Sequence, residues 1–140
     1  ETIQAVYSMG IWLELVTLLI PDYNDSDKEL SEMAEFIAGI SPAIPWHVTA
    51  YHPDYKMRDR ERTPVDPLLS ATRHVKRAGL HFVYAGNLPG QVKNTENTYC
   101  PHCQELLVER KGFRVLSIKL NDDLCPSCNV SVPGRWINSF

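Results

Sequence analysis

Four cysteines near the end of the chain are the residues whose type and spacing most clearly predict chemistry. They form two C-x2-C pairs, "TYCPHCQELL" (Cys100 and Cys103) and "DDLCPSCNV" (Cys125 and Cys128). Two-residue spacing lets backbone N–H groups of a tight turn point at the thiolates, and a β-hairpin between the pairs can bring them together. Because four thiolates complete a tetrahedral shell, the pattern predicts a closed metal site with a structural role.

Zinc is the metal that this pattern predicts, with rubredoxin-like iron, an iron–sulfur cluster and unmetallated thiols as the alternatives. A ribbon of roughly 40 residues buries little apolar surface, so a metal would supply much of its folding free energy. His102 lies inside the first pair, but it is not expected to be a ligand because four cysteines already complete the shell. In a chain without a secretion signal, this spacing predicts a reducing compartment, the cytoplasm.

The charge pattern argues against nucleic acid and membrane partners. Between Glu96 and Phe140, five basic residues (Arg110, Lys111, Arg114, Lys119, Arg135) are balanced by five acidic ones (Glu96, Glu105, Glu109, Asp122, Asp123). The whole chain carries a net charge of -3, whereas phosphate binding requires a surplus of Lys and Arg. The longest apolar run, Leu15 to Ile20, is far shorter than the ~20 residues of a membrane span. We therefore expect neither partner.

Predicted strands and helices alternate along residues 1–90. Three apolar runs predict strands: "IWLELVTLLIP", "PWHVTAYHP" and "HFVYAGN". The first run is nearly continuous, which is typical of a strand buried on both faces of a parallel sheet. Between the first two, Ser26 and Glu29 stand at capping-box spacing ahead of a helical stripe. Thr63 is predicted to cap a second helix, with Pro64 at its first position and Gly79 at its end.

This alternation, with short connections, predicts an α/β fold with a parallel sheet. Since three strands are visible, we expect either a small open sheet or a partial (β/α) barrel of about three β/α units, the C-terminal half of a barrel. Residues 1–90 are assigned to this part, 91–99 to a polar linker, and 100–136 to a zinc-ribbon-like β hairpin with the four cysteines. The chain opens at Glu1 with residues typical of a helix end, so we expect a segment of a longer protein.

The second predicted strand has one apolar and one polar face. Alternation places Trp46, Val48 and Ala50 on the apolar face and His47, Thr49 and Tyr51 on the polar face. A polar inner face is typical of a barrel strand that lines a wet lumen. His52 follows at the carboxyl end of the strand, where α/β folds place their chemistry. The alternative is that His47 or His52 only hydrogen-bonds a loop.

Polar residues also follow the other two predicted strands at this edge. Asn24 and Asp25 come after the first strand and Asn87 after the third, where each could either contact a ligand or only shape a helix start or a turn. The loop "KMRDRERTP" interleaves basic and acidic residues. Charge runs are usually solvated surface, and the alternative is a loop that binds an anionic partner.

Five segments together carry a family resemblance: "LLIPDYNDSDKEL", "PWHVTAYHPDYK", "TPVDPLLSATRHVKRAGLHFVYAGNLPG", "ENTYCPHC" and "VPGRW". They resemble the radical S-adenosylmethionine enzyme of the AmmeMemoRadiSam system, a relative of the pyruvate formate-lyase activating enzyme. The likeness runs from Trp12 to Trp136. One departure is Asp22, which stands where the family usually has a glycine after proline, and it bears on the backbone conformation of that loop.

The resemblance implies a radical-SAM partial barrel followed by a cysteine-rich tail. In the related activating enzymes, a Tyr-His at the end of a late barrel strand helps to hold S-adenosylmethionine, and the matching residues here are Tyr51 and His52. The exit of the first strand around Ile20 resembles a wall of the adenine pocket. Together with Asn87 at the same rim, these residues form the predicted cofactor-binding set.

The family's cluster motif C-x3-C-x2-C, which binds a four-iron four-sulfur cluster, is absent from this chain. Reductive cleavage of S-adenosylmethionine needs the open iron of that cluster, so the chain alone is expected to be inactive. The expected partner is the missing N-terminal half of the barrel, and open sheet edges also predict self-association.

Three hypotheses of function follow. The first is the C-terminal portion of a radical-SAM oxidoreductase that supplies part of the cofactor pocket and a metal-bound tail. The second is a rubredoxin-like electron-transfer module or zinc-ribbon binding module on an α/β scaffold. The third is a small α/β domain whose zinc ribbon docks onto a partner protein without any chemistry.

Overall fold

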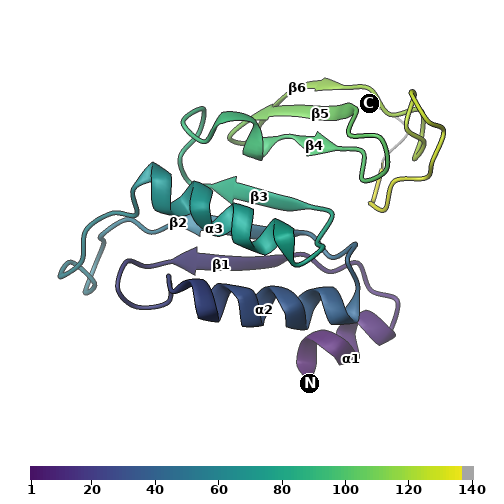
Figure 1. Cartoon of the computed structure of the whole chain (residues 1–140). Helices are drawn as coiled ribbons and strands as arrows, with labels where there is room; N and C mark the ends of the chain where they lie inside the picture. The colour runs from purple at the N-terminus through teal and green to yellow at the C-terminus, as the bar shows by residue number, and fades with distance from the viewer. Residues whose placement is uncertain (137–140) are drawn as a thin grey trace.

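The computed structural model describes residues 1–136 as a mixed α/β protein with two small sheets (Figure 1). The elements are α1 (Thr2–Ser8), β1 (Leu15–Leu19), α2 (Asp27–Ile40), β2 (Trp46–Ala50), α3 (Val65–Arg77), β3 (Val83–Gly86), the 3-10 helix η1 (Lys93–Glu96), β4 (Thr98–Tyr99), β5 (Leu106–Lys111) and β6 (Arg114–Ile118). Within the described residues, none of these helices has both the length and the apolar content to cross a bilayer. The α/β class predicted from the sequence is therefore confirmed.

The first sheet is parallel, with strand order β1-β2-β3. Both long helices, α2 and α3, lie on the same face of this sheet (Figure 1). Alternate strand residues such as Leu19, Trp46 and Ala85 are buried against helix residues such as Leu30 and Leu68. Helices of a parallel α/β fold have to bury one apolar stripe each, and here both stripes share a single core on one side of the sheet.

The prediction that the first strand is buried on both faces is wrong. In β1, Leu19 is buried, whereas Val16 is 68% exposed and Leu18 is 42% exposed. The near-continuous apolar run suggested burial on both faces, because strands covered by helices on both sides have that composition. Here the helices cover only one side of the sheet, so the alternate residues of β1 face away from the core.

Of the two predicted helix N-caps, the one at α2 is confirmed and the one at α3 is wrong. Ser26 caps α2 as predicted: its Oγ accepts from the N–H of Glu29 at 3.3 Å and donates to the Glu29 carboxylate at 2.6 Å. Thr63 does not cap α3, because the cap residue is Pro64. The buried Thr63 hydroxyl instead accepts from the Tyr51 N–H and donates to a backbone carbonyl of β1. Because it makes these tertiary hydrogen bonds, it does not bond the first turn of α3.

The two-faced pattern of β2 is confirmed within the strand. Trp46, Val48 and Ala50 are buried, and His47 and Thr49 on the other face are half-exposed. Tyr51, which was predicted on the polar face, is buried, with 3% of its surface exposed, and its hydroxyl donates to the Met57 carbonyl. Strand alternation fails there because β2 ends at Ala50 and the chain turns into the following loop.

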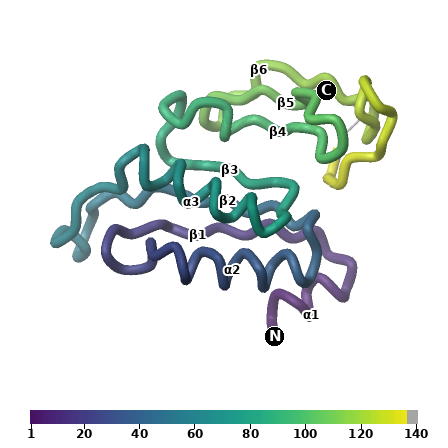
Figure 2. Tube along the Cα trace, in the orientation of Figure 1, coloured from purple at the N-terminus to yellow at the C-terminus, as the bar shows by residue number. Residues whose placement is uncertain are grey.

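The second sheet is antiparallel, with order β4-β5-β6, and contains the predicted hairpin between the cysteine pairs. The trace in Figure 2 shows that this ribbon lies on the β3 side of the first sheet and that α1 lies on the β1 side. Residues 91–99 contain η1 and β4, with Val92, Glu96 and Thr98 buried. The segment between the two sheets is therefore packed against its surroundings.

A buried carboxylate fixes the ribbon to the loop after β3. Glu96 is 8% exposed, and its Oε2 accepts from the N–H of Gly90 at 2.9 Å while its Oε1 accepts from the N–H of Gly112 at 2.7 Å. Gly90 belongs to the loop that follows β3, and Gly112 forms the turn between β5 and β6. One side chain thus joins two segments that are distant in sequence through two charge-assisted hydrogen bonds.

Candidate metal centre

The four cysteine sulfurs converge at one point of the ribbon. All four Sγ atoms lie within 4.8 Å of one another, and the Cys100–Cys128 and Cys103–Cys125 distances are both 3.6 Å. A tetrahedral zinc with metal–sulfur bonds of about 2.3 Å has sulfur–sulfur edges of about 3.8 Å. The cluster is therefore positioned to bind a metal ion, with each of the two short contacts joining one pair to the other.

The two pairs sit in equivalent turns. The N–H of Gln104 bonds the Cys100 carbonyl at 3.0 Å, and the N–H of Asn129 bonds the Cys125 carbonyl at 2.9 Å. Gln104 and Asn129 both have a positive φ, 63° and 57°, a conformation that turns each chain sharply after its second cysteine. Such turns aim backbone N–H groups at sulfur, which is the geometry that the C-x2-C spacing predicted.

The local electrostatics favour the thiolate form of one of the two buried cysteines, Cys100. Burial of Cys100 acts to raise the pKa of its thiol, but hydrogen bonds from the backbone N–H groups of Cys103 and His102 outweigh this and lower the pKa to about 7. Cys128 shows the opposite result: the Val130 N–H lowers its pKa, but burial and the three neighbouring thiols raise it to about 12. Four thiols this close cannot all ionise unless a cation compensates their charge, and a bound metal does so.

Burial differs among the four cysteines. Cys100 and Cys125 are fully buried, Cys128 is half-buried and Cys103 is exposed. The buried pair belongs to the small core of the ribbon, which also contains Phe82, Leu107, Val108 and Val132. Two of these six core residues are therefore candidate ligands, so the packing of the ribbon depends on the geometry of the cysteine site.

The residues of the predicted cofactor-binding set all follow strands at the carboxyl edge of the first sheet, and they differ in exposure. Ile20 and Tyr51 are buried, and His52 and Asn87 are exposed. The Asn87 side-chain amide donates to the Ala50 carbonyl at 3.0 Å, which ties β3 to β2. Asn87 therefore has a structural contact that its sequence position did not reveal.

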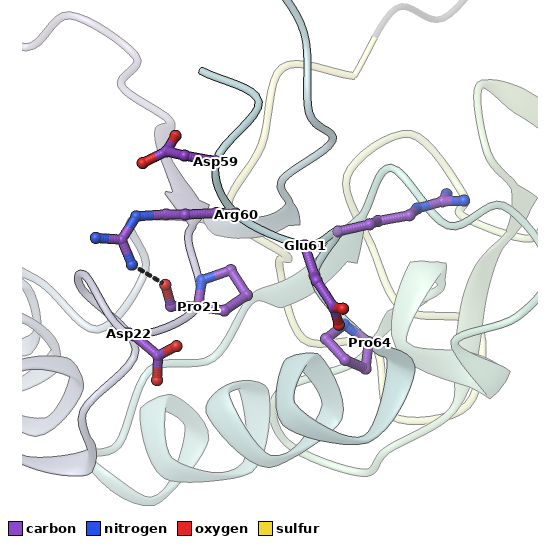
Figure 3. Close-up of a pocket in the computed structure, with 7 residues that line it drawn as sticks. Pro21, Asp22, Asp59, Arg60, Glu61 and Pro64 are labelled. Carbon is purple, nitrogen blue, oxygen red and sulfur yellow. Dashed lines mark hydrogen bonds between the residues drawn. The ribbon is translucent and has the colours of Figure 1, made fainter.

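A separate cleft of about 440 Å³ opens at this edge, lined by Pro21, Asp22, Asp59, Arg60, Glu61, Arg62 and Pro64 (Figure 3). Arg60 donates to the Pro21 carbonyl at 2.7 Å and lies over the Tyr23 ring at 5.7 Å. Arg62 donates to the Asn87 carbonyl at 3.3 Å. These hydrogen bonds hold the charged loop against the loops after β1 and β3. The lining of the cleft contains both acidic and basic side chains.

Asp22 keeps the backbone conformation that favours glycine. Its φ is 57°, and its N–H donates to the Asp25 carboxylate at 3.1 Å. Aspartate is among the non-glycine residues that best tolerate this region. The structure therefore has a left-handed turn at Asp22.

Sequence reasoning missed a polar cluster on the side of the first sheet away from the helices. His47 Nε2 lies 2.8 Å from Glu14 Oε2, and the His47 ring stacks on Tyr84 with centroids 5.0 Å apart. Tyr84 bonds Thr98 of the ribbon at 2.9 Å. Burial of Glu14 acts to raise its pKa, but hydrogen bonds from Trp12 and His47 lower it overall. Glu14 precedes its strand and gave no motif, so only the fold brings it to His47.

No family model matches the chain, and no solved structure matches it. The chain is 35% identical over 135 residues to a protein of Methanocaldococcus jannaschii that is described only as uncharacterized. The match covers 94% of this chain and 40% of that relative, so the chain spans about two fifths of the relative's length. The comparison identifies a longer homologue and assigns no activity to either protein.

Proposed function

We propose that the chain is a metal-binding α/β segment in which the four cysteines hold one structural zinc ion. The observation that carries this proposal is the convergence of four sulfurs within 4.8 Å from two equivalent turns. Four thiolates fill the tetrahedral shell that zinc prefers and leave no position for water or substrate. Because two core residues of the ribbon, Cys100 and Cys125, would themselves be ligands, the metal would contribute directly to the folding of this part.

Metal analysis of protein purified without added metal tests the proposal. One zinc per chain and a colourless protein is the expected result. Cys125→Ser should abolish stoichiometric zinc, whereas Ser127→Ala, an exposed change in the same turn, should retain it. Wild-type protein that folds with no bound metal would refute the structural zinc.

Rubredoxin-like iron is the second candidate, and the exposure of Cys103 favours it. A ligand sulfur at the surface gives a partner protein a short path for electron transfer, which a fully buried site lacks. Iron in a four-sulfur site would give a red protein whose colour bleaches on reduction. One iron per chain and a reversible redox response would replace the zinc proposal with an electron-transfer module.

We further propose that the chain is the C-terminal portion of a radical-SAM enzyme related to the activating enzymes. The parallel order β1-β2-β3 and the helices on a single face are consistent with part of a (β/α) barrel. The length of the M. jannaschii relative supports a longer parent protein. In that parent, His52 and Tyr51 would contact S-adenosylmethionine beside Ile20 and Asn87, and an N-terminal half would supply the four-iron cluster.

Cofactor cleavage tests this second proposal. After iron–sulfur reconstitution and reduction, the 140-residue chain should release no 5′-deoxyadenosine, whereas the longer gene product should release it together with methionine. In the longer protein, His52→Ala should weaken S-adenosylmethionine binding, and His81→Ala, an exposed histidine ahead of β3, should not. Cleavage by the isolated chain, or equal effects of the two substitutions, would contradict the assignment.

A further inference from the structure

The first sheet has an open face, defined here as the side away from α2 and α3. It carries Val16, Leu18, His47, Thr49, Tyr84 and Gly86, which alternate with the buried residues of the three strands. Val16 and Leu18 of β1 are 68% and 42% exposed. The ribbon packs against Tyr84 at the β3 end of this face. Apolar side chains on a sheet face are normally covered by another layer, so Val16 and Leu18 at the β1 end lack a covering element among the described residues.

The open edge of the same sheet is β1. On the opposite side, Tyr84 of β3 bonds Thr98 of the ribbon, so the ribbon occupies the β3 side. The N–H of Leu15 bonds the Pro45 carbonyl, and the Leu19 carbonyl accepts from the N–H of Tyr51, so these residues face β2. By alternation, the backbone groups of Val16 and Leu18 point away from β2.

Asn24 closes one end of this edge. Its side-chain NH2 donates to the Leu18 carbonyl at 3.0 Å, and its side-chain oxygen accepts from the N–H of Ile20 at 2.8 Å. A neighbouring strand would use this same carbonyl and this same N–H. The amide of Asn24 therefore replaces a strand at the carboxyl end of β1 and leaves the Val16 groups and the Leu18 N–H available.

We propose that a further strand of the same polypeptide pairs in parallel with β1 along Val16, ends before Ile20, and brings side chains that cover Val16 and Leu18. This inference rests on the proposed function, in which the chain is part of a longer protein. The M. jannaschii relative has well over half of its length outside the match, which is ample for additional β/α units. A parallel strand that ends before Ile20 would pair with the amino end of β1, where the backbone groups of Val16 and the N–H of Leu18 are available.

The position of Asn24 also argues against a second copy as the occupant. Two β1 strands related by a two-fold axis would pair antiparallel. The open amino end of each strand would then lie against the carboxyl end of the other, where Asn24 already holds the Leu18 carbonyl and the Ile20 N–H. Such a pair would lose hydrogen bonds that a parallel strand keeps.

Residue-resolved hydrogen–deuterium exchange on the zinc-loaded chain and on the native gene product tests the inference. In the 140-residue chain, the Ile20 amide should be protected through Asn24, while the Val16 and Leu18 amides exchange rapidly. In the longer protein, these two amides should slow by at least about 100-fold, as expected of strand hydrogen bonds. Val16→Lys should remove the protection at Leu18, and the matched control Val115→Lys on β6, at a side chain 48% exposed, should not.

Three results would overturn the proposed strand. The first is rapid exchange of the Val16 and Leu18 amides in the native gene product, and the second is a native gene product with no residues beyond this chain. The third is a doubled mass of the isolated chain with both amides already protected, which would identify a second copy as the occupant. The zinc content and 5′-deoxyadenosine release are measured on the same samples. Protected amides in a protein without cofactor cleavage would retain the strand and refute the radical-SAM assignment, and cleavage with exposed amides would do the reverse.

Discussion

Replacing Glu96 should lower the free energy of unfolding more than replacing an exposed carboxylate would. Glu96→Ala removes the acceptor of two backbone N–H groups, those of Gly90 and Gly112. Each hydrogen bond to a charged group contributes about 1.5–3 kcal/mol. Gly90 is exposed and Gly112 is half-buried, so water can partly replace the carboxylate. We therefore take about 1–2 kcal/mol per bond and expect a loss of about 2–4 kcal/mol.

Thermal unfolding of the zinc-loaded protein, followed by circular dichroism, measures this loss. For a chain of this size, 1 kcal/mol shifts the midpoint by roughly 3–5 °C, so the expected loss of about 2–4 kcal/mol from Glu96→Ala should lower Tm by roughly 6–20 °C. Glu96→Gln should give a smaller decrease, because the amide keeps one acceptor but turns a donor toward the second N–H. The control is Glu32→Ala, whose exposed pair with Lys28 at 3.9 Å contributes about 0–0.5 kcal/mol.

The order of the Tm values of the three variants shows whether the two hydrogen bonds of Glu96 stabilise the protein. If Glu96→Ala lowered Tm by no more than Glu32→Ala, the two hydrogen bonds would contribute nothing measurable and the attachment of the ribbon to the first sheet would have to rest on other contacts. A normal Tm for Glu96→Gln with a low one for Glu96→Ala would show that packing, and not charge, is responsible.

Three further predictions concern the sheet, the polar cluster and the metal. Gly86→Ala should cost about 1–3 kcal/mol because its Cβ would lie 2.8 Å from Thr49 Cγ2; urea unfolding should show a smaller cost in a Thr49→Ser background, and equal costs would exclude the clash. Glu14→Gln should make the free energy of unfolding depend less on pH in the acid range. The pKa of Glu14 lies below 4.5 in the folded protein, so the stability that Glu14 contributes is present above pH 4.5 and is lost as the pH falls through the folded-state pKa. The same pH dependence in the variant and the wild type would contradict this prediction. Chelation of the metal should speed amide exchange at Leu107 in the ribbon and leave Val48 in the first sheet protected; equal exchange at both sites would show that the two sheets unfold together.

Features that depend on local sequence were predictable. The convergence of the four cysteines follows from spacing and turn geometry, and the Ser26 capping box follows from two side chains three residues apart. The alternating faces of Trp46 and His47 follow from the two-residue period of a strand. In each case the relevant partners are neighbours in sequence, or are brought together by one hairpin.

The roles of other residues could be assigned only from the fold. Glu14 bonds His47 across strands, and Thr63 bonds groups of β1 and Tyr51 instead of capping its helix. These contacts join segments that are far apart in sequence, so no local pattern carried them.

The sequence alone determined that the chain would form an α/β core and gather four cysteine sulfurs in its tail, because periodicity and short-range spacing act within single elements. The tertiary structure decided which side of β1 is covered, that Asn24 closes its carboxyl end, and that Glu96 connects the ribbon to the first sheet. The physical reason is that burial and hydrogen-bond satisfaction depend on which distant segments become neighbours. An apolar residue such as Val16 is equally suited to a core or to a face that awaits its partner, and only packing distinguishes the two.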